Sequence, residues 1–187
     1  RCWPSMIRPD DLFDHARALL PSRRGRPKEV DLRRGTSAAY YAVFHHLTDE
    51  AARHLIGSAP QLDQNKIRRT WSHGELAAAA DMIDERSNVL KRDPHAELPK
   101  PAQAWGPLVD MAAKDVALVE ALRLFSELQG RRHLADYDHD ASFDKLTLLS
   151  ALRDATRSRE LLAAASAASR EALFTLITVR RSDFRER

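Results

Sequence analysis

The residues with the clearest chemistry lie between positions 132 and 139. Arg132 and His139 are seven residues apart, so on a continuous helix they would lie two turns apart on one side, in line with Phe125, Leu128 and Ala135. The planar guanidinium of arginine binds phosphate and stabilises charge that develops on it, and histidine exchanges a proton near neutral pH. The pair suits cleavage of an RNA phosphodiester without a metal, with the 2′-hydroxyl of the substrate as nucleophile.

Three further polar residues of this segment, His133, Asp136 and Tyr137, are candidates to orient Arg132 and His139. A charged group at the edge of a core must be paired, because burial of an unpaired charge costs free energy. An alternative interpretation therefore remains open. In that interpretation Arg132 forms an ion pair with Asp136, four residues on, and the other polar residues only form the end of a helix.

A second polar set lies on the segment from about Val30 to Leu55. Tyr41 and His45 share a helical side with Arg34 and Ala38. A different side carries the apolar stripe of that segment, which is Tyr40, Phe44, Leu47, Ala51 and Leu55. We expect Tyr41 and His45 to line the same cleft as Arg132. The alternative is that both are packing residues whose polar tips reach water.

Basic residues supply candidate contacts to RNA phosphates, although the formal net charge is only +3. Arg33 and Arg34 belong to one basic cluster and Arg69 to another, and we expect these three to contribute RNA affinity that weakens with salt. The alternative is that the clusters only solvate the chain. The two clusters are Arg23, Arg24, Arg26, Lys28, Arg33 and Arg34, and Lys66, Arg68 and Arg69.

Composition and motifs exclude several classes of protein and site. The 187 residues are 43% hydrophobic and 30% charged, which is typical of a globular chain. The one cysteine, Cys2, allows neither an internal disulfide nor a cysteine-based zinc site, and it favours a cytoplasmic protein. No metal-protease, phosphate-loop or dinucleotide-binding motif occurs, so we expect no metal and no cofactor. No apolar segment has the length of a membrane span, and we expect no membrane contact.

Apolar periodicity predicts one all-α domain over residues 1–187, an antiparallel bundle of about five helices. Three prolines, at positions 94, 99 and 101, predict an exposed connector at about 91–105. The last helix is expected to begin near Ser142 as N-cap and to bury Leu146 and Leu149. The five predicted helices are about 10–20, 30–55, 62–89 with a break near 72–74, 105 into the 130s, and 142–177 with a kink at 166–169.

Two segments together resemble the HEPN family. The segment from Arg33 to His45, RRGTSAAYYAVFH, is similar to the family's arginine-led A-Y-Y-A-x-F-H helix. The segment from Phe125 to Asp138, FSELQGRRHLADYD, is similar to its later R-x-x-A-D-Y segment. The catalytic motif of the family is an arginine, a polar residue, and a histidine after four to six intervening residues. Arg132, His133 and His139 match it with six intervening residues.

The resemblance implies a helical bundle that forms a homodimer, with the motif of both subunits facing one cleft. It also implies a metal-independent endoribonuclease of a toxin–antitoxin or phage-defence system, with RNA as substrate and an antitoxin or other protein as partner. The alternative is a non-catalytic HEPN module that binds a partner protein, a nucleotide or RNA. A helical scaffold that only dimerises is a third possibility. In one toxin subgroup of the family, a partner nucleotidyltransferase can modify a tyrosine two residues after the histidine. Here Tyr137 precedes His139 and position 141 is alanine, so that tyrosine has no counterpart.

Overall fold

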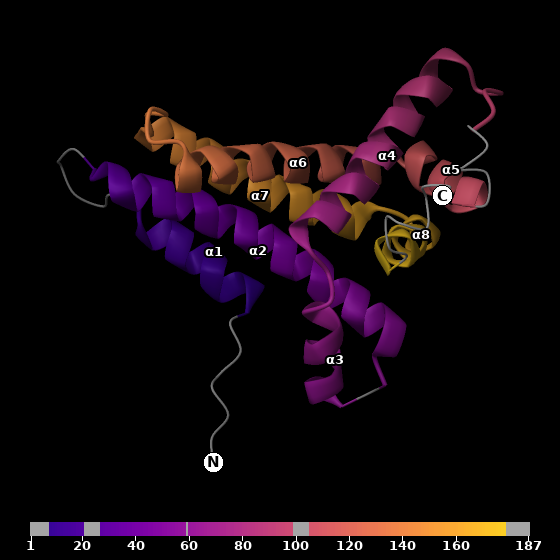
Figure 1. Cartoon of the computed structure of the whole chain (residues 1–187), viewed down its shortest axis with the longest axis horizontal. Coiled ribbons are helices and arrows are strands. Elements are labelled where there is room, and N and C mark those ends of the chain that lie inside the picture. The colour runs from indigo at the N-terminus through magenta and orange to yellow at the C-terminus, as the bar shows by residue number, and fades with distance from the viewer. Residues whose placement is uncertain (1–7, 21–26, 59, 99–104, 179–187) are drawn as a thin grey trace.

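The computed structural model describes residues 8–20, 27–58, 60–98 and 105–178. All regular structure in these ranges is helical, which confirms the predicted all-α class (Figure 1). Eight helices are present where about five were expected. They are α1 (Pro9–Ala18), α2 (Glu29–Ile56), α3 (Gln61–Arg68), α4 (His73–Arg92), α5 (Gly106–Lys114), α6 (Val116–Tyr137), α7 (Lys145–Ala164) and α8 (Ala167–Thr178).

Capping side chains explain most of the difference in helix number. Each of three residues accepts a hydrogen bond from the backbone N–H group of the helix that it starts: Ser72 at α4, Asp115 at α6 and Asp144 at α7. Such caps satisfy donors that a helix start leaves free. Ser72 begins α4 at the predicted break near 72–74, and Asp115 begins α6 where one continuous helix was predicted. Asp144, and not Ser142 as expected, is the N-cap of α7.

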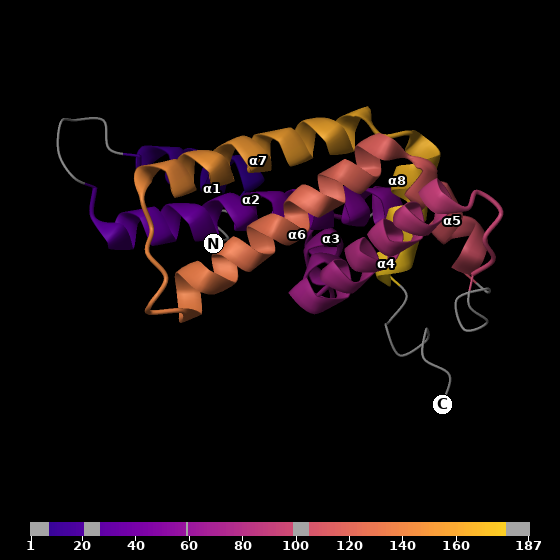
Figure 2. The ribbon, with the colours of Figure 1, turned by 90° about the horizontal axis from the view of Figure 1, so that it is seen from above.

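Helix α2 lies at the centre of the helical layer. It packs against α1, α6 and α7, and these four helices run side by side along the length of the molecule (Figure 2). Its residues from 35 to 40 are all buried, so this part of α2 is enclosed on every side. The small side chains of this stretch let neighbouring helices approach closely. Helices α4, α5 and α8 pack against one another near the start of α6.

The predicted apolar faces are confirmed in α6 and in most of α2, but they fail at two helix ends. Tyr40, Phe44 and Leu47 are buried as expected, whereas Leu55 is 38% exposed. Leu146 and Leu149, predicted to be buried, are 72% and 39% exposed. They lie in the first turns of α7, and Leu148 is the residue of this stretch that points into the core.

No single helix among the described ones has both the length and the apolarity needed to cross a lipid bilayer. Helices α7 and α8 meet that criterion only when they are taken together, across a bend of 112°.

Gly35 lies where α2 packs closely against α7 and α1. A β-carbon added to this residue would lie 2.8 and 2.9 Å from the two methyl groups of Leu148 on α7, and 3.5 Å from the carbonyl oxygen of Ala16 on α1. Leu148 is completely buried, so its side chain has little space into which it could move. Gly130, in the interior of α6, offers a contrast, because a β-carbon there would meet no atom within 4 Å.

We predict that Gly35→Ala and Gly130→Ala change the free energy of unfolding in opposite directions. Alanine favours a helix over glycine by up to about 1 kcal/mol, so Gly130→Ala should stabilise the protein. Overpacking of a core costs roughly 1–3 kcal/mol, so Gly35→Ala should destabilise it. Urea unfolding followed by circular dichroism measures both variants. Equal stabilisation by the two substitutions would show that α2 and α7 are not tightly packed at this point.

Candidate functional site

The arginine site, defined as Arg132 with Ser37, Tyr41, Asp136 and Tyr137, joins α2 to the end of α6. Arg132 donates a hydrogen bond from Nη2 to the hydroxyl oxygen of Tyr41 at 2.7 Å, and the hydroxyl oxygen of Tyr137 lies 3.5 Å from the same nitrogen. The guanidinium carbon lies 5.4 Å from the ring centre of Tyr41 and 5.2 Å from that of Tyr137. These distances allow a cation–π attraction to both rings.

Asp136 anchors the arginine site from one turn farther along α6. Its Oδ2 atom lies 2.7 Å from Nε of Arg132. The N–H group does not point at this oxygen, so the contact is an ion pair without a hydrogen bond. Its Oδ1 atom accepts a hydrogen bond from the hydroxyl of Ser37 on α2 at 2.5 Å. The pairing of Arg132 with Asp136, left open in the sequence, is present in the structure.

His139 does not lie on the same helical side as Arg132, because α6 ends at Tyr137. Asp138 adopts an extended backbone, and its Oδ1 atom accepts hydrogen bonds from the N–H groups of Asp140 and Ala141. This local turn competes with another helical turn for the same N–H groups. His139 is exposed in the resulting loop, and no side-chain hydrogen bond joins it to a described residue.

The side chain of Arg33 binds backbone carbonyl groups of the same chain. Its guanidinium donates hydrogen bonds to the carbonyl oxygens of Leu134, Ala135, Asp138 and Ala141, with the bond to Asp138 at 2.7 Å. A further bond joins its Nε to Glu29 at 3.0 Å, and its guanidinium carbon lies 4.8 Å from the ring centre of Phe143. Carbonyl groups at the end of a helix have no partners of their own, so Arg33 satisfies them.

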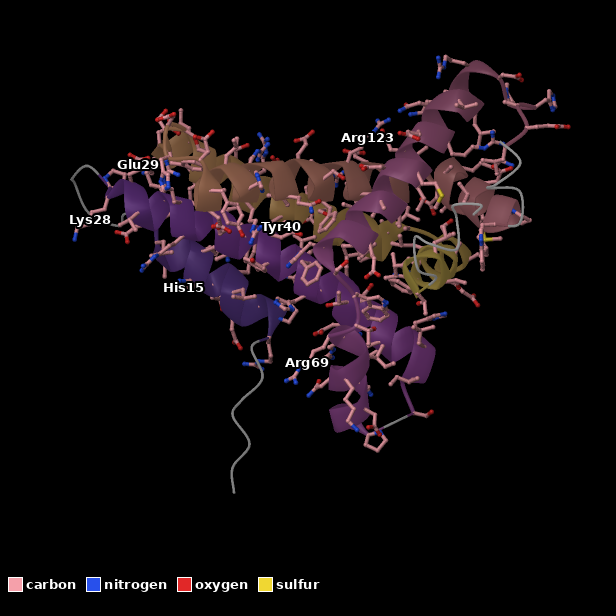
Figure 3. The ribbon with its side chains drawn as sticks, viewed as in Figure 1. His15, Lys28, Glu29, Tyr40, Arg69 and Arg123 are labelled. Carbon is pink, nitrogen blue, oxygen red and sulfur yellow. The ribbon has the colours of Figure 1, made fainter. Side chains whose placement is uncertain are left out.

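The other two residues expected to bind RNA are exposed and far apart along the chain. Arg34 lies near the start of α2, and Arg69 ends α3. Figure 3 places Arg69 beside α3, below the centre of that view, whereas Lys28 and Glu29 mark the start of α2 at the left. Arg34 therefore belongs to the same end of α2 as the clamp made by Arg33, and Arg69 belongs to a separate part of the surface. The first basic cluster also included Arg23, Arg24 and Arg26, which lie outside the described residues.

A group of aromatic rings borders the arginine site on the α4 side. His45 stacks on Tyr41 with ring centres 6.2 Å apart. His73, the first residue of α4, lies 5.6 Å from Tyr41 and 4.0 Å from Phe44 between ring centres. Sequence reasoning noted position 73 only as a helix break. The Ser72-x-x-Glu75 capping box fixes His73 as the first helical residue, but nothing local indicates which helix it will contact.

Burial keeps both of these imidazoles neutral at neutral pH. It lowers the pKa of His73, and the positive charge of Arg132 lowers it further. Burial also lowers the pKa of His45, against the opposing effect of Asp49. Desolvation disfavours the charged form of an imidazole, so the direction is the same in both cases. Arg132 therefore carries the only permanent positive charge in the described part of the arginine site.

His133 and Tyr137 extend the arginine site onto exposed surface. Their ring centres are 5.0 Å apart, and Tyr137 is 60% exposed. His133 is also exposed. The five residues expected to support Arg132 thus lie in two groups. Tyr41, Asp136 and Tyr137 contact it directly, and His45 and His133 contact those tyrosines.

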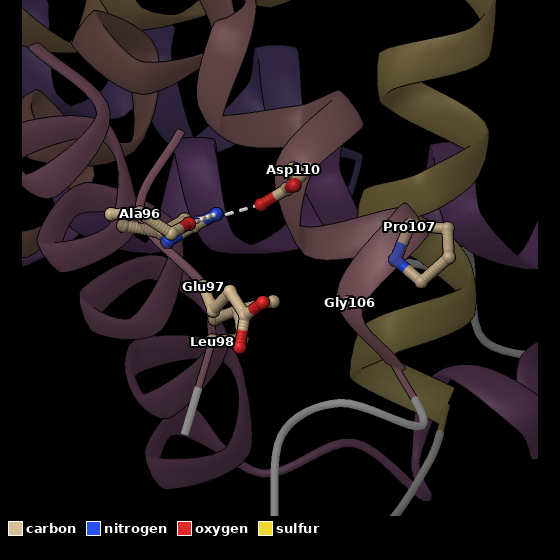
Figure 4. A pocket seen from close by; sticks show the side chains of 7 residues that line it. Ala96, Glu97, Leu98, Gly106, Pro107 and Asp110 are labelled. Atoms are coloured by element: carbon tan, nitrogen blue, oxygen red, sulfur yellow. Dashed lines mark hydrogen bonds and ion pairs between the residues drawn. The ribbon is translucent and has the colours of Figure 1, made fainter. Parts of the chain in front are cut away.

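A separate pocket of about 410 Å³ lies between the loop after α4 and the start of α5 (Figure 4). Arg86 lines this pocket, and it donates hydrogen bonds to Asp110 at 2.6 Å and to the carbonyl oxygen of Ala96 at 2.6 Å. The side chain of Arg86 is only 6% exposed, compared with 18% for Arg132, so this pocket presents less of its guanidinium to a ligand than the arginine site does. No group of His, Cys, Asp and Glu side chains in the described ranges has the arrangement of a metal site.

Comparison with known proteins gives no assignment. No family model, no curated protein and no solved structure matches the chain.

We predict that the neighbouring residues Arg33 and Arg34 have different roles. Arg33→Lys should lower the free energy of unfolding by about 2 kcal/mol or more, because one ammonium group cannot satisfy four carbonyl oxygens and a hydrogen bond to a charged group contributes roughly 1.5–3 kcal/mol. Arg34→Lys should change it by less than about 0.5 kcal/mol, as surface substitutions do. Chemical unfolding of the two variants tests this difference. A loss of equal size in both would contradict the clamp.

Proposed function

We propose that the chain is a HEPN-type helical module that binds RNA at the arginine site. The observation that carries this proposal is the position of Arg132, held between Tyr41 and the exposed Tyr137 at the surface. Its Nη1 atom has no hydrogen bond to any described residue, so part of the guanidinium is available to a ligand.

The chemistry of the arginine site fits a phosphate flanked by a base. A guanidinium presents paired donors that match the oxygens of a phosphate. Unstacked bases of single-stranded RNA stack on exposed aromatic side chains, and Tyr137 with His133 provides such rings beside Arg132. Arg34 adds a positive charge at the start of α2, next to the Arg33 that binds the end of α6.

An extended strand fits this surface better than an enclosed nucleotide does. Leu134 and Tyr137, on either side of Asp136, are 44% and 60% exposed. Sites for free nucleotides are usually concave and bury most of the ligand. A strand of RNA can instead cross an open surface, where successive contacts to phosphates and bases add up.

A second candidate function is the metal-independent endoribonuclease of a toxin–antitoxin or phage-defence system. His139 favours it, because the exposed loop leaves its imidazole free to reach a substrate. This candidate requires a homodimer, in which a second copy of the chain brings another Arg132 and His139 to one cleft. Leu134, Tyr137, Leu146 and Leu149 are exposed at the joined ends of α6 and α7, and they would provide the apolar contact.

We predict that Arg132→Gln weakens RNA binding at least tenfold. A hydrogen bond to a charged group contributes roughly 1.5–3 kcal/mol, and 1.4 kcal/mol corresponds to a factor of ten in Kd. The slope of log K against the logarithm of the salt concentration should also become shallower by about one, because one contact to a phosphate is lost. Fluorescence anisotropy of a labelled single-stranded RNA, measured at several salt concentrations, gives both quantities.

The matched control is Arg92→Gln, which removes the same charge from the exposed last residue of α4, at the far end of the bundle (Figure 1). It should bind RNA as the parent does. Thermal unfolding by circular dichroism shows whether Arg132→Gln remains folded. If both variants bind alike while folded, RNA affinity comes from general charge and the arginine site is not its source.

For the second candidate, we predict cleavage of a mixed-sequence RNA by the purified protein in EDTA. The products should carry 2′,3′-cyclic phosphate ends, because the 2′-hydroxyl is the nucleophile. Arg132→Gln and His139→Ala should each abolish cleavage, and sedimentation should give the mass of a dimer. If the RNA stays intact while the protein binds it normally, the protein is a binding module and not a nuclease. Cleavage that survives both substitutions would come from a contaminant or from another site.

A further inference from the structure

His73 meets the arginine site from a third helix. It is the first residue of α4, and its ring packs on the aromatic side chains of α2, with ring centres 4.0 Å from Phe44, 5.5 Å from Tyr40 and 5.6 Å from Tyr41. Tyr41 in turn accepts the hydrogen bond from Arg132. The imidazole of His73 and the guanidinium of Arg132 therefore border the same tyrosine.

Tyr40 determines which nitrogen of His73 carries the proton. Its side chain is completely buried midway along α2, where α4 begins (Figure 3), and its hydroxyl oxygen lies 2.7 Å from Nδ1 of His73. This is the one hydrogen bond that Tyr40 makes through its hydroxyl within the described residues. Burial raises the pKa of Tyr40, so the phenol keeps its proton.

A buried hydroxyl proton without an acceptor would cost roughly 1–3 kcal/mol. The Tyr40 hydroxyl therefore donates to Nδ1, and the proton of the neutral imidazole lies on Nε2. This Nε2 atom has no hydrogen bond to a described residue, and it is not fully buried. It is open to solvent as a fixed N–H donor.

We propose that His73 is the second anion-binding residue of the arginine site, and that its Nε2–H donates to a non-bridging oxygen of the RNA phosphate that Arg132 holds. This inference rests on the proposed RNA binding. One positive charge from Arg132 together with one neutral donor matches the single negative charge of a phosphodiester. A neutral imidazole also contributes its hydrogen bond without the desolvation cost of a second buried cation.

The experiment measures binding of a fluorescein-labelled 2′-O-methyl RNA oligonucleotide, which cannot be cleaved through its own 2′-hydroxyl. His73→Leu should weaken binding about tenfold, as loss of a hydrogen bond to a charged group does. His73→Gln should remain within about twofold of the parent, because the amide N–H of glutamine takes the position of Nε2–H. His15→Leu, on the exposed face of α1, is the matched control and should bind as the parent does.

A spectroscopic measurement tests the tautomer without RNA. The ¹⁵N chemical shifts of the His73 ring should place the proton on Nε2 in the parent, and Tyr40→Phe should yield a mixture of tautomers. A proton on Nδ1 in the parent would overturn the proposal. So would a folded His73→Leu variant that binds the oligonucleotide as tightly as the parent while Arg132→Gln does not. If the parent protein itself does not bind the oligonucleotide, the proposed RNA binding is wrong as well. This result differs from the one in which the parent binds but His73 makes no contribution.

Discussion

The clamp made by Arg33 determines where α6 ends and thus what the arginine site contains. One guanidinium on α2 gathers carbonyl groups from the last turn of α6 and from the loop that leads to α7. Those carbonyls would otherwise face water or continue the helix. The clamp holds the end of α6 against α2, so that Arg132 meets Tyr41 and Asp136 meets Ser37. The same contact leaves His139 beyond the helix.

The arginine site has little net charge of its own, which limits what it can bind. Asp136 balances much of the charge on Arg132, and burial keeps His45 and His73 neutral. A highly charged ligand such as a triphosphate would find one cation at the arginine site, and no cluster of metal ligands occurs among the described residues. A ligand with one negative charge per unit and a ring to stack is the better match, and single-stranded RNA has both features.

Sequence reasoning found the residues of the arginine site better than it found their arrangement. The helical class, the burial of Phe125 and Leu128 and the Arg132–Asp136 spacing follow from local periodicity. Besides the local turn at Asp138, the end of α6 is held by Arg33, which lies about a hundred residues earlier, and no local pattern contains that contact. His73 was missed for the same reason, because only the packing of α4 across α2 brings it to Tyr40. The roles of these residues in RNA binding remain predictions.

The cap of α4 has a consequence for the pre-organisation of the arginine site. His73 is the first helical residue, and the reciprocal hydrogen bonds of Ser72 and Glu75 fix the turn that carries it. Helix ends fray more readily than helix interiors. The orientation of the imidazole is therefore coupled to the stability of a single helical turn and to the short segment between α3 and α4. Changes in that segment should alter the entropy of the RNA binding proposed for the arginine site without replacing any residue proposed to contact the RNA.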